Sequence, residues 1–251
     1  MKLASLSAAA LLAVPMAQAD TPPFDRPGIA FSTQTLPAGH LDWEQGLPDE
    51  VRSSDDQGTH STLDSATTRI RVGLTSHLEL QVATTLYNRL QSRDAGTTSV
   101  DHGPGDVTLA FKRAMPPPSD RISWALLSAV ELNTGKAPFA NDRPRYLLAA
   151  SASMHLDDTH ATGLYAGVAR SGRYNTYTLS PNFGFSLGAH LGGYVEAGCT
   201  FGQHTDKDVV AGGGLAWMAA ETVQLDMYVL RGLTARSTDL QAGLGVSIYF
   251  P

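Results

Sequence analysis

The sequence ends in the stretch Leu240-Gln241-Ala242-Gly243-Leu244-Gly245-Val246-Ser247-Ile248-Tyr249-Phe250, followed by Pro251. Apolar residues alternate strictly with small or polar ones, so every second side chain falls on the same face of an extended strand. Alternation over about ten residues has the length and period with which a tilted β-strand crosses a bilayer once. The apolar face holds Leu240, Ala242, Leu244, Val246, Ile248 and Phe250, and the other face holds Gln241, Gly243, Gly245, Ser247 and Tyr249.

A membrane strand at the end of a chain has one unpaired edge. Lipid offers no hydrogen-bond partner to that edge, so the last strand is expected to pair with the first one and close a barrel. The terminal aromatic residue, Phe250, resembles the C-terminal signal that outer-membrane proteins present to their assembly machinery. This resemblance implies export to the bacterial outer membrane, with the assembly machinery as a partner through the C-terminal strand.

The N-terminus has the pattern of a secretory signal peptide. Met1-Lys2 precedes an apolar and small stretch over residues 3–14, and Ala17-Gln18-Ala19 forms an A-x-A cleavage site. The apolar core is too short for a transmembrane helix, and no later apolar run approaches the length of about 18 residues that one needs. We therefore predict a signal peptide at 1–19, an extended periplasmic lead-in at 20–40, and a barrel domain at 41–251.

Composition excludes several classes of function and site. The net charge of −6 argues against nucleic-acid binding, which favours a basic face. The single cysteine, Cys199, rules out an internal disulfide, and it falls in phase with lipid-facing residues. The histidines have no partner at metal-ligand spacing, so neither a metal site nor a cofactor is predicted.

Eleven further segments repeat the alternation of the last strand. Pro181 is awkward in its segment because proline cannot donate to a strand ladder, so that strand is expected either to begin after it or to bulge. With the last strand, the segments predict an all-β, transmembrane, antiparallel β-barrel of about 12 strands. The predicted segments are residues 41–47, 65–74, 78–88, 105–115, 121–133, 146–156, 162–171, 177–187, 193–201, 209–218 and 223–231.

The connections between these segments alternate in length. Short turns are expected near His77, Pro117, Asp158, Ala189 and Ala220, whereas long or polar loops are expected at 51–63, 89–103 and 134–145. Short periplasmic turns and longer external loops are typical of outer-membrane barrels, with both termini in the periplasm. The alternative is a soluble barrel with an ordinary core, since period-two alternation looks the same in both classes. Strands of about ten residues favour the membrane, because ordinary strands run to about five or six.

Several short motifs carry a family resemblance. They are Asp25-Arg26-Pro27, the segment 36–46, the segment 69–80, and Gly103-Pro104-Gly105-Asp106 with the strand that follows it. In this order they resemble the outer-membrane transporter family associated with the meta-cleavage pathway of phenol degradation. The resemblance implies passage of small molecules, aromatic ones among them.

Charged side chains of the predicted strands are expected to point into the lumen, because a charge on the lipid face costs a few kcal/mol. Glu79 lies between strands that carry Arg71 and Lys112, so cross-strand ion pairs are expected there. Two hypotheses stay open. The charges only solvate and brace the lumen, or the basic residues form a positive strip that guides anions such as aromatic carboxylates, with the later acidic residues opposite. The candidate lumen and selectivity residues are Arg69, Arg71, Glu79, Lys112, Glu131, Glu196 and Asp226.

The predicted function is passive uptake of small solutes through an outer-membrane channel, without enzymatic activity. Twelve strands lie between the eight that fill their own interior and the sixteen that leave a wide channel, so the sequence leaves the openness of the lumen undecided. One alternative is a non-transporting structural or binding barrel. Another is a lipid hydrolase, for which His60-Ser61 with Asp64 is the nearest nucleophile and base.

Overall fold

The computed structural model describes residues 22–251 except 56–58 and 204, so the signal peptide predicted at 1–19 lies outside the described residues. The described chain consists of strands and loops, and no helix in it is long and apolar enough to cross a membrane. The strands are β1 (Leu41–Ser54), β2 (His60–Thr75), β3 (Leu78–Asp94), β4 (Thr97–Gly103), β5 (Val107–Ala114), β6 (Ile122–Leu132), β7 (Arg145–His155), β8 (His160–Ser171), β9 (Tyr174–Ser186), β10 (Leu191–Gly202), β11 (Thr205–Ala220), β12 (Val223–Gly232) and β13 (Leu240–Phe250).

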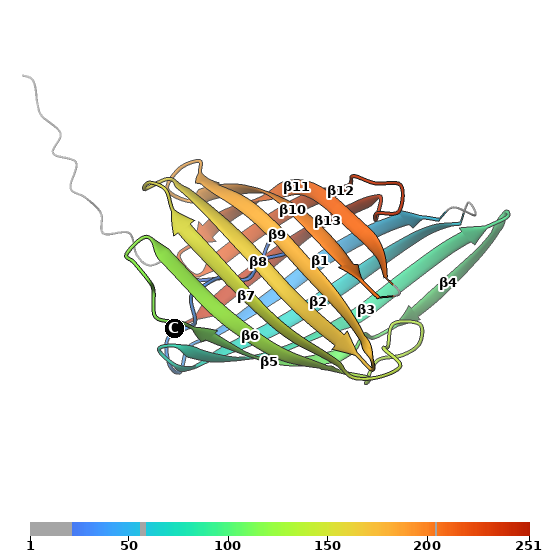
Figure 1. Ribbon diagram of the computed structural model, residues 1–251, viewed down its shortest axis with the longest axis horizontal. Coiled ribbons are helices and arrows are strands. Elements are labelled where there is room, and N and C mark those ends of the chain that lie inside the picture. The colour runs from blue at the N-terminus through green and yellow to red at the C-terminus, as the bar shows by residue number, and fades with distance from the viewer. Residues whose placement is uncertain (1–21, 56–58, 204) are drawn as a thin grey trace, which may run out of the picture.

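The strands form one closed antiparallel barrel (Figure 1). Closure occurs where β13 pairs with β1, with Leu41 opposite Phe250, as the edge argument predicts. β4 and β5 both pair with β3, β4 along its outer part and β5 along its first part. They therefore share one place in the wall, and the barrel has twelve strand positions. The predicted fold class and strand number are confirmed.

The outer surface of the barrel is apolar. Along β13, Leu244 is 52% exposed, whereas the neighbouring inward side chain of Ser247 is fully buried. Large apolar side chains exposed on other strands include Leu109, Phe111, Leu148, Leu164, Leu179, Val195 and Met227. An apolar surface on every side suits lipid and not water, so the soluble-barrel alternative is wrong. The chain is therefore a membrane-spanning β-barrel.

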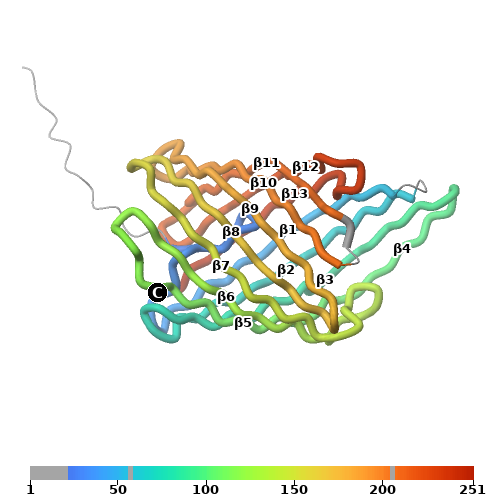
Figure 2. The backbone as a smooth tube through the Cα atoms, viewed as in Figure 1, coloured from blue at the N-terminus to red at the C-terminus, as the bar shows by residue number. Residues whose placement is uncertain are grey.

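Two predicted loops are wrong. Residues 51–63 mostly continue β1 and β2, and residues 89–103 form a hairpin of β3 with β4. Figure 2 shows this hairpin projecting from one end of the barrel. Polar residues predominate on both faces of these segments, because strand extensions beyond the apolar band need no continuous row of lipid-facing side chains. We call this end the loop end, and the opposite end, where Leu41 and Phe250 lie, the terminal end.

Two prolines affect the wall differently. At Leu47 and Pro48, two residues of β1 stand opposite one residue of β13, which is a β-bulge. The bulge reverses the alternation, so Asp49 faces the lumen opposite Gly243. Pro181, in contrast, lies exposed within β9 and opposite Leu164, with no register shift. Neither expected solution for Pro181, a later strand start or a bulge, is correct.

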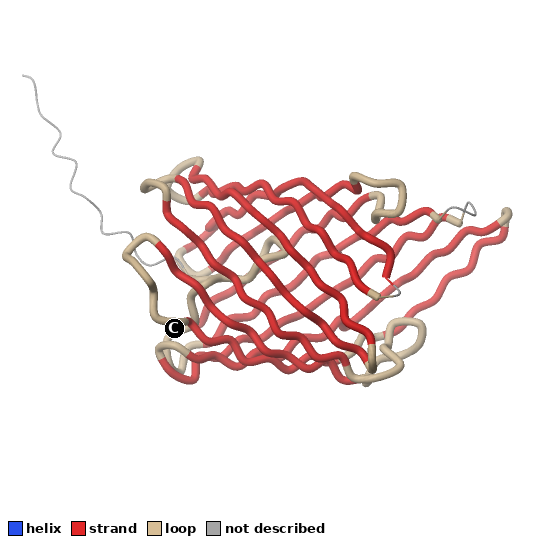
Figure 3. Tube along the Cα trace, in the orientation of Figure 1, coloured by secondary structure: helices blue, strands red, loops and turns tan. Residues whose placement is uncertain are grey.

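Residues 22–40 form a non-strand segment that lies inside the barrel, which we call the insert (Figure 3). The prediction of an extended periplasmic lead-in at 20–40 did not include this position inside the barrel. The inner wall is shaped to receive them. A Cβ atom at Gly73 would overlap the backbone of Pro37, and one at Gly245 would overlap the side chain of Arg26. Glycines on the inner face of the wall thus leave the space that the insert occupies.

Candidate functional site in the barrel lumen

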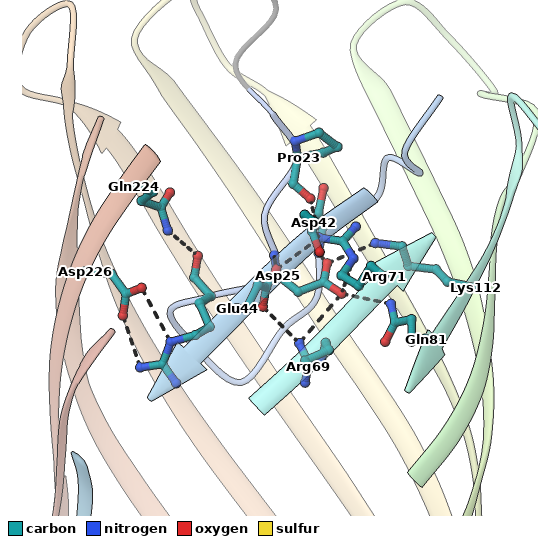
Figure 4. Close-up of polar contacts among 12 residues, drawn as sticks. Pro23, Asp25, Asp42, Glu44, Arg69, Arg71, Gln81, Lys112, Gln224 and Asp226 are labelled. Carbon is teal, nitrogen blue, oxygen red and sulfur yellow. Dashed lines mark hydrogen bonds and ion pairs between the residues drawn. The ribbon is translucent and has the colours of Figure 1, made fainter. Parts of the chain in front are cut away.

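Seven charged residues meet where the insert touches β1, β2, β3 and β5, and we call them the buried charge cluster (Figure 4). Arg71 lies at the centre. Its Nε is 2.7 Å from Glu79 Oε1, and its Nη1 is 2.9 Å from Asp42 Oδ2 and 3.1 Å from Glu44 Oε1. The cluster consists of Asp25, Asp42, Glu44, Arg69, Arg71, Glu79 and Lys112.

Asp25 brings the insert into this cluster. Its Oδ1 accepts a hydrogen bond from Lys112 Nζ at 2.9 Å, and its Oδ2 accepts one from Gln81 Nε2 at 3.0 Å. Its own backbone N–H donates to Glu44 Oε1 at 2.6 Å. Lys112 also lies 3.3 Å from Glu79, so both ion pairs expected for Glu79 are present. The insert is therefore held by charges that also join four strands to one another.

The geometry limits the positive strip that the sequence suggested. The side chains of Arg71 and Lys112 are fully buried, and only that of Arg69 is partly exposed, at 33%. The three basic residues face four carboxylates within the cluster. Arg71 and Lys112 are thus closed off from a passing solute, and their charge is already neutralised.

A second anchor lies across the lumen. Arg26 Nη2 is 3.1 Å from Asp226 Oδ1 on β12 and 3.2 Å from Asp49 Oδ1 on β1. Gln224 donates to the backbone oxygen of Arg26 at 2.9 Å (Figure 4). Asp226, which was expected to line the lumen, therefore binds the insert. The bulge in β1 places a second carboxylate, that of Asp49, against the same Arg26 side chain.

The insert also contacts the wall formed by β6 and β10. Ile29 N–H donates to Glu196 Oε2 at 3.1 Å, and the Thr33 and Ser123 hydroxyls lie 2.7 Å apart. Phe31 packs edge-on against Tyr165 of β8, with ring centroids 5.9 Å apart. The insert thus spans the lumen from one side to the other.

Three cavities follow one another past the insert. A cavity of about 320 Å³ lies toward the loop end, one of about 300 Å³ in the middle, and one of about 370 Å³ toward the terminal end. The first two share Thr67, Ala83 and Thr108, and the last two share four insert residues, among them Gly28 and Phe31. The insert therefore forms the boundary between the middle and terminal-end cavities.

The loop-end cavity is closed on one side by the loop at 133–144, to which Pro138 and Phe139 belong. Glu131, a predicted lumen residue, lines this cavity and lies 3.4 Å from Arg145, with both side chains partly exposed. Asp106, between β4 and β5, holds the loop by accepting hydrogen bonds from the backbone N–H groups of Gly135 at 2.8 Å and Asn141 at 2.7 Å.

We expect acid to release this loop. Burial alone would raise the pKa of Asp106, but the N–H groups of Asn141 and Gly135 outweigh it and hold that pKa below its usual range. A carboxyl with a lowered pKa stabilises the folded loop above its unfolded pKa of about 3.9 and loses this effect as pH falls through the lowered value. Hydrogen exchange at Gly135 and Asn141 should thus show full protection at neutral pH and reduced protection factors in strong acid.

Asp106→Asn should lower the same protection at neutral pH by roughly tenfold, because a hydrogen bond to a charged acceptor is worth about 1.5–3 kcal/mol. Asp142→Asn is the matched control, since Asp142 lies exposed in the same loop. Equal protection in the two variants would contradict this role of Asp106.

The residues of the hydrolase alternative do not form a catalytic arrangement. His60 and Ser61 lie in β2, not in a loop. The His60 Nδ1 atom is 2.8 Å from Ser54 Oγ, and Ser61 donates to the backbone oxygen of Ser53. Asp64 pairs with Arg89. Each member therefore has a different partner.

Sequence reasoning missed Asp25, Arg26 and Asp49, which place the insert, and Asp42, which pairs with Arg71. Asp25 and Arg26 lie in a segment without periodicity, so no pattern assigned them to the lumen. Their only signal was that Asp25-Arg26-Pro27 is among the motifs of the family resemblance.

Several solved structures have the same fold. An outer membrane channel from Pseudomonas putida F1 superposes with a TM-score of 0.76 at 16% sequence identity, covering 90% of this chain and 99% of that chain. The β domain of the Bordetella autotransporter BrkA gives a TM-score of 0.59 at 12% identity, covering 84% of this chain and all of the other. The KdgM porin gives 0.55 at 12% identity, covering 84% and 99%. At these identities the likeness shows the fold alone.

The sequence comparisons are more specific. No curated protein matches the chain. One family does match, over residues 24–250, and this range includes nearly the whole insert and all the strands. The chain therefore belongs to the family described as "Putative MetA-pathway of phenol degradation".

Proposed function

We propose that the chain is a passive outer-membrane channel for small solutes, which move through the three cavities from the loop end to the terminal end. In this orientation the terminal end faces the periplasm. The observation that carries the proposal is the series of cavities with shared lining residues, interrupted by a narrow insert and not by a packed core. The outer-membrane channel among the similar structures supports the same function. We also propose that the assembly machinery recognises β13 and its terminal Phe250.

The predicted lumen residues divide into two groups in this proposal. Arg71, Glu79, Lys112 and Asp226 hold the insert in place. Arg69, Glu131 and Glu196 line cavities, and a solute would meet them. Both signs of charge occur along the path, so the charges do not identify the class of solute. Our choice of small aromatic molecules rests on the size of the cavities and on the family description.

The test is conductance of the mature protein in a planar bilayer. Stable single-channel steps that phenol or benzoate blocks at millimolar concentration are expected. The absence of channel currents would overturn the proposal. Gel electrophoresis in detergent, in which a folded barrel resists unfolding, would show that the protein tested was folded. It would favour a non-transporting structural or binding barrel.

A further inference from the structure

Three arginines converge on the turn between β8 and β9 at the loop end, and we call them the arginine cluster. Arg170 Nε donates to the backbone oxygen of Gly172 at 3.1 Å, and Arg143 Nη1 lies 3.3 Å from the position that a Cβ atom at Gly172 would take. Arg173 follows Gly172 directly, and its guanidinium lies over the ring of Tyr174, 5.3 Å from the centroid. All three arginines are exposed, so their donors are open to a partner outside the chain.

Carboxylates do not neutralise the arginine cluster. Glu131 pairs with Arg145 at 3.4 Å, and within the described residues no member of the cluster takes part in an ion pair. The segments 131–146 and 170–177, which surround the turn, hold five basic and two acidic residues, which leaves a net charge of +3. The surface around this turn therefore favours an anion.

The arginine cluster lies at the border of the lipid-facing wall. Arg170 stands opposite Tyr146 in the pairing of β7 with β8, and Tyr177 lies on the same outer face of β9. The two tyrosines are 59% and 42% exposed. Exposed tyrosine rings on the outside of a membrane barrel mark the level of the lipid headgroups. The arginines are thus at the height where headgroup phosphates are found.

An apolar groove begins directly below the arginine cluster on the same outer face. Going from Arg170 toward the terminal end, the next outward residues of β8 are Val168 and Ala166. Ala166 stands opposite Ala150 of β7, and these two small side chains hollow the wall between larger neighbours on β6, β7 and β9, which lie side by side (Figure 1). The groove has a volume of about 510 Å³, and its larger lining side chains are Leu126, Leu148, Val168, Tyr177, Leu179 and Phe201.

We propose that the arginine cluster and this groove together bind a lipid with a phosphorylated headgroup in the leaflet at the loop end. A guanidinium presents its donors in a fork that matches phosphate oxygens, and its attraction to anionic lipids is strongest close to the membrane surface. An acyl chain in the groove gives the atoms around Ala150 and Ala166 the van der Waals contacts that a void would deny them. A phosphorylated lipid carries both groups in one molecule, whereas a free anion would use only the arginines. The inference goes beyond the proposed channel function and does not depend on it.

Titration of the mature protein in an uncharged detergent, followed by native mass spectrometry, tests the headgroup part. Dimyristoyl phosphatidic acid should bind tightly, and both dimyristoylglycerol and glycerol 3-phosphate should bind much more weakly. Arg170→Gln should weaken binding of the phosphatidic acid by about tenfold, because it removes donors to a charged acceptor. Arg231→Gln is the matched control, since Arg231 is also exposed at the loop end, on β12 and away from the groove, and it should leave the affinity unchanged.

Ala166→Leu tests the groove without changing any charge. The larger side chain fills the groove and should weaken binding of the phosphatidic acid by about fivefold, because it takes packing contacts from the acyl chain. Ala211→Leu is its control, since it adds the same side chain on β11, outside the groove. Equal affinities in the variants and their controls would overturn the site. Glycerol 3-phosphate that binds as tightly as the lipid would also overturn it, because the arginines would then bind a free anion only. Either result leaves the channel function standing.

Discussion

Replacing Arg71 by methionine is expected to lower the free energy of unfolding of the barrel by about 3–5 kcal/mol, the range for breaking a buried ion pair by removing one partner. Arg71 is fully buried and contacts the carboxylates of Asp42, Glu44 and Glu79. Methionine fills similar volume but offers no donor, so these carboxylates would keep their desolvation cost and lose their main partner. Urea unfolding in detergent micelles, followed by tryptophan fluorescence, measures the change.

Arg69→Met is the matched control for this prediction. Arg69 belongs to the same cluster, but it is partly exposed and lies 3.4 Å from Glu44 and 3.8 Å from Asp25. A loose, partly solvated pair contributes about 0–1 kcal/mol. Similar losses of unfolding free energy in the two variants would contradict the prediction, because they would show that the full burial of Arg71 does not increase its contribution to stability. Adding Glu79→Gln to Arg71→Met should recover part of the loss, because it removes one of the unpaired charges.

The wall of the barrel was predictable because lipid imposes one simple rule on it. Each strand that crosses the bilayer must present apolar side chains outward, and β13 does so without exception from Leu240 to Phe250. Closure with β1 follows from the same rule, since no edge can stay unpaired. The rule applies only to the part of each strand that contacts lipid. The strand extensions at 51–54 and 89–103 are mostly polar and lack a continuous apolar row, so their sequence resembles that of a loop.

The contacts in the lumen were less predictable, because the residues that pair there lie far apart in the chain. Arg26 meets Asp226, two hundred positions away, and no periodicity links them. Asp49 reaches the lumen only because the bulge at Leu47 and Pro48 reverses the alternation. Strand pattern alone assigned Arg71, Glu79 and Lys112 to the interior, and their mutual pairs are confirmed. It gave no sign that a segment outside the strands would occupy the same space.

The balance of charges in the cluster bears on what the insert does. Asp25 is the one acidic member that the insert supplies, and the wall itself holds three basic and three acidic members. Without Asp25, the wall's part of the cluster would therefore be electrically balanced. Ordering the insert costs conformational entropy, which its ion pairs and hydrogen bonds must offset. A segment that the wall does not need for its own charge balance is better explained by its place in the solute path.

A variant lacking residues 24–34 should therefore fold and conduct more strongly than wild type. Removing these residues takes Phe31 and Gly28 from the boundary between the middle and terminal-end cavities. We expect single-channel conductance to rise about two- to threefold, as the interior of a twelve-stranded barrel approaches an open lumen. Wild-type conductance should show more frequent partial closures than the variant does.

Gly245→Val tests the same idea without shortening the chain. A side chain at this position would overlap Arg26, displace it from Asp226 and Asp49, and so loosen one end of the insert. Gly184→Val is its control, because Gly184 lies on β9, and no atom of the insert is near its Cβ position. Conductance should rise with Gly245→Val and stay at the wild-type value with Gly184→Val. If the deletion and Gly245→Val both fold and conduct as wild type does, the insert is not the constriction, and the narrowest point lies instead at the loop over 133–144.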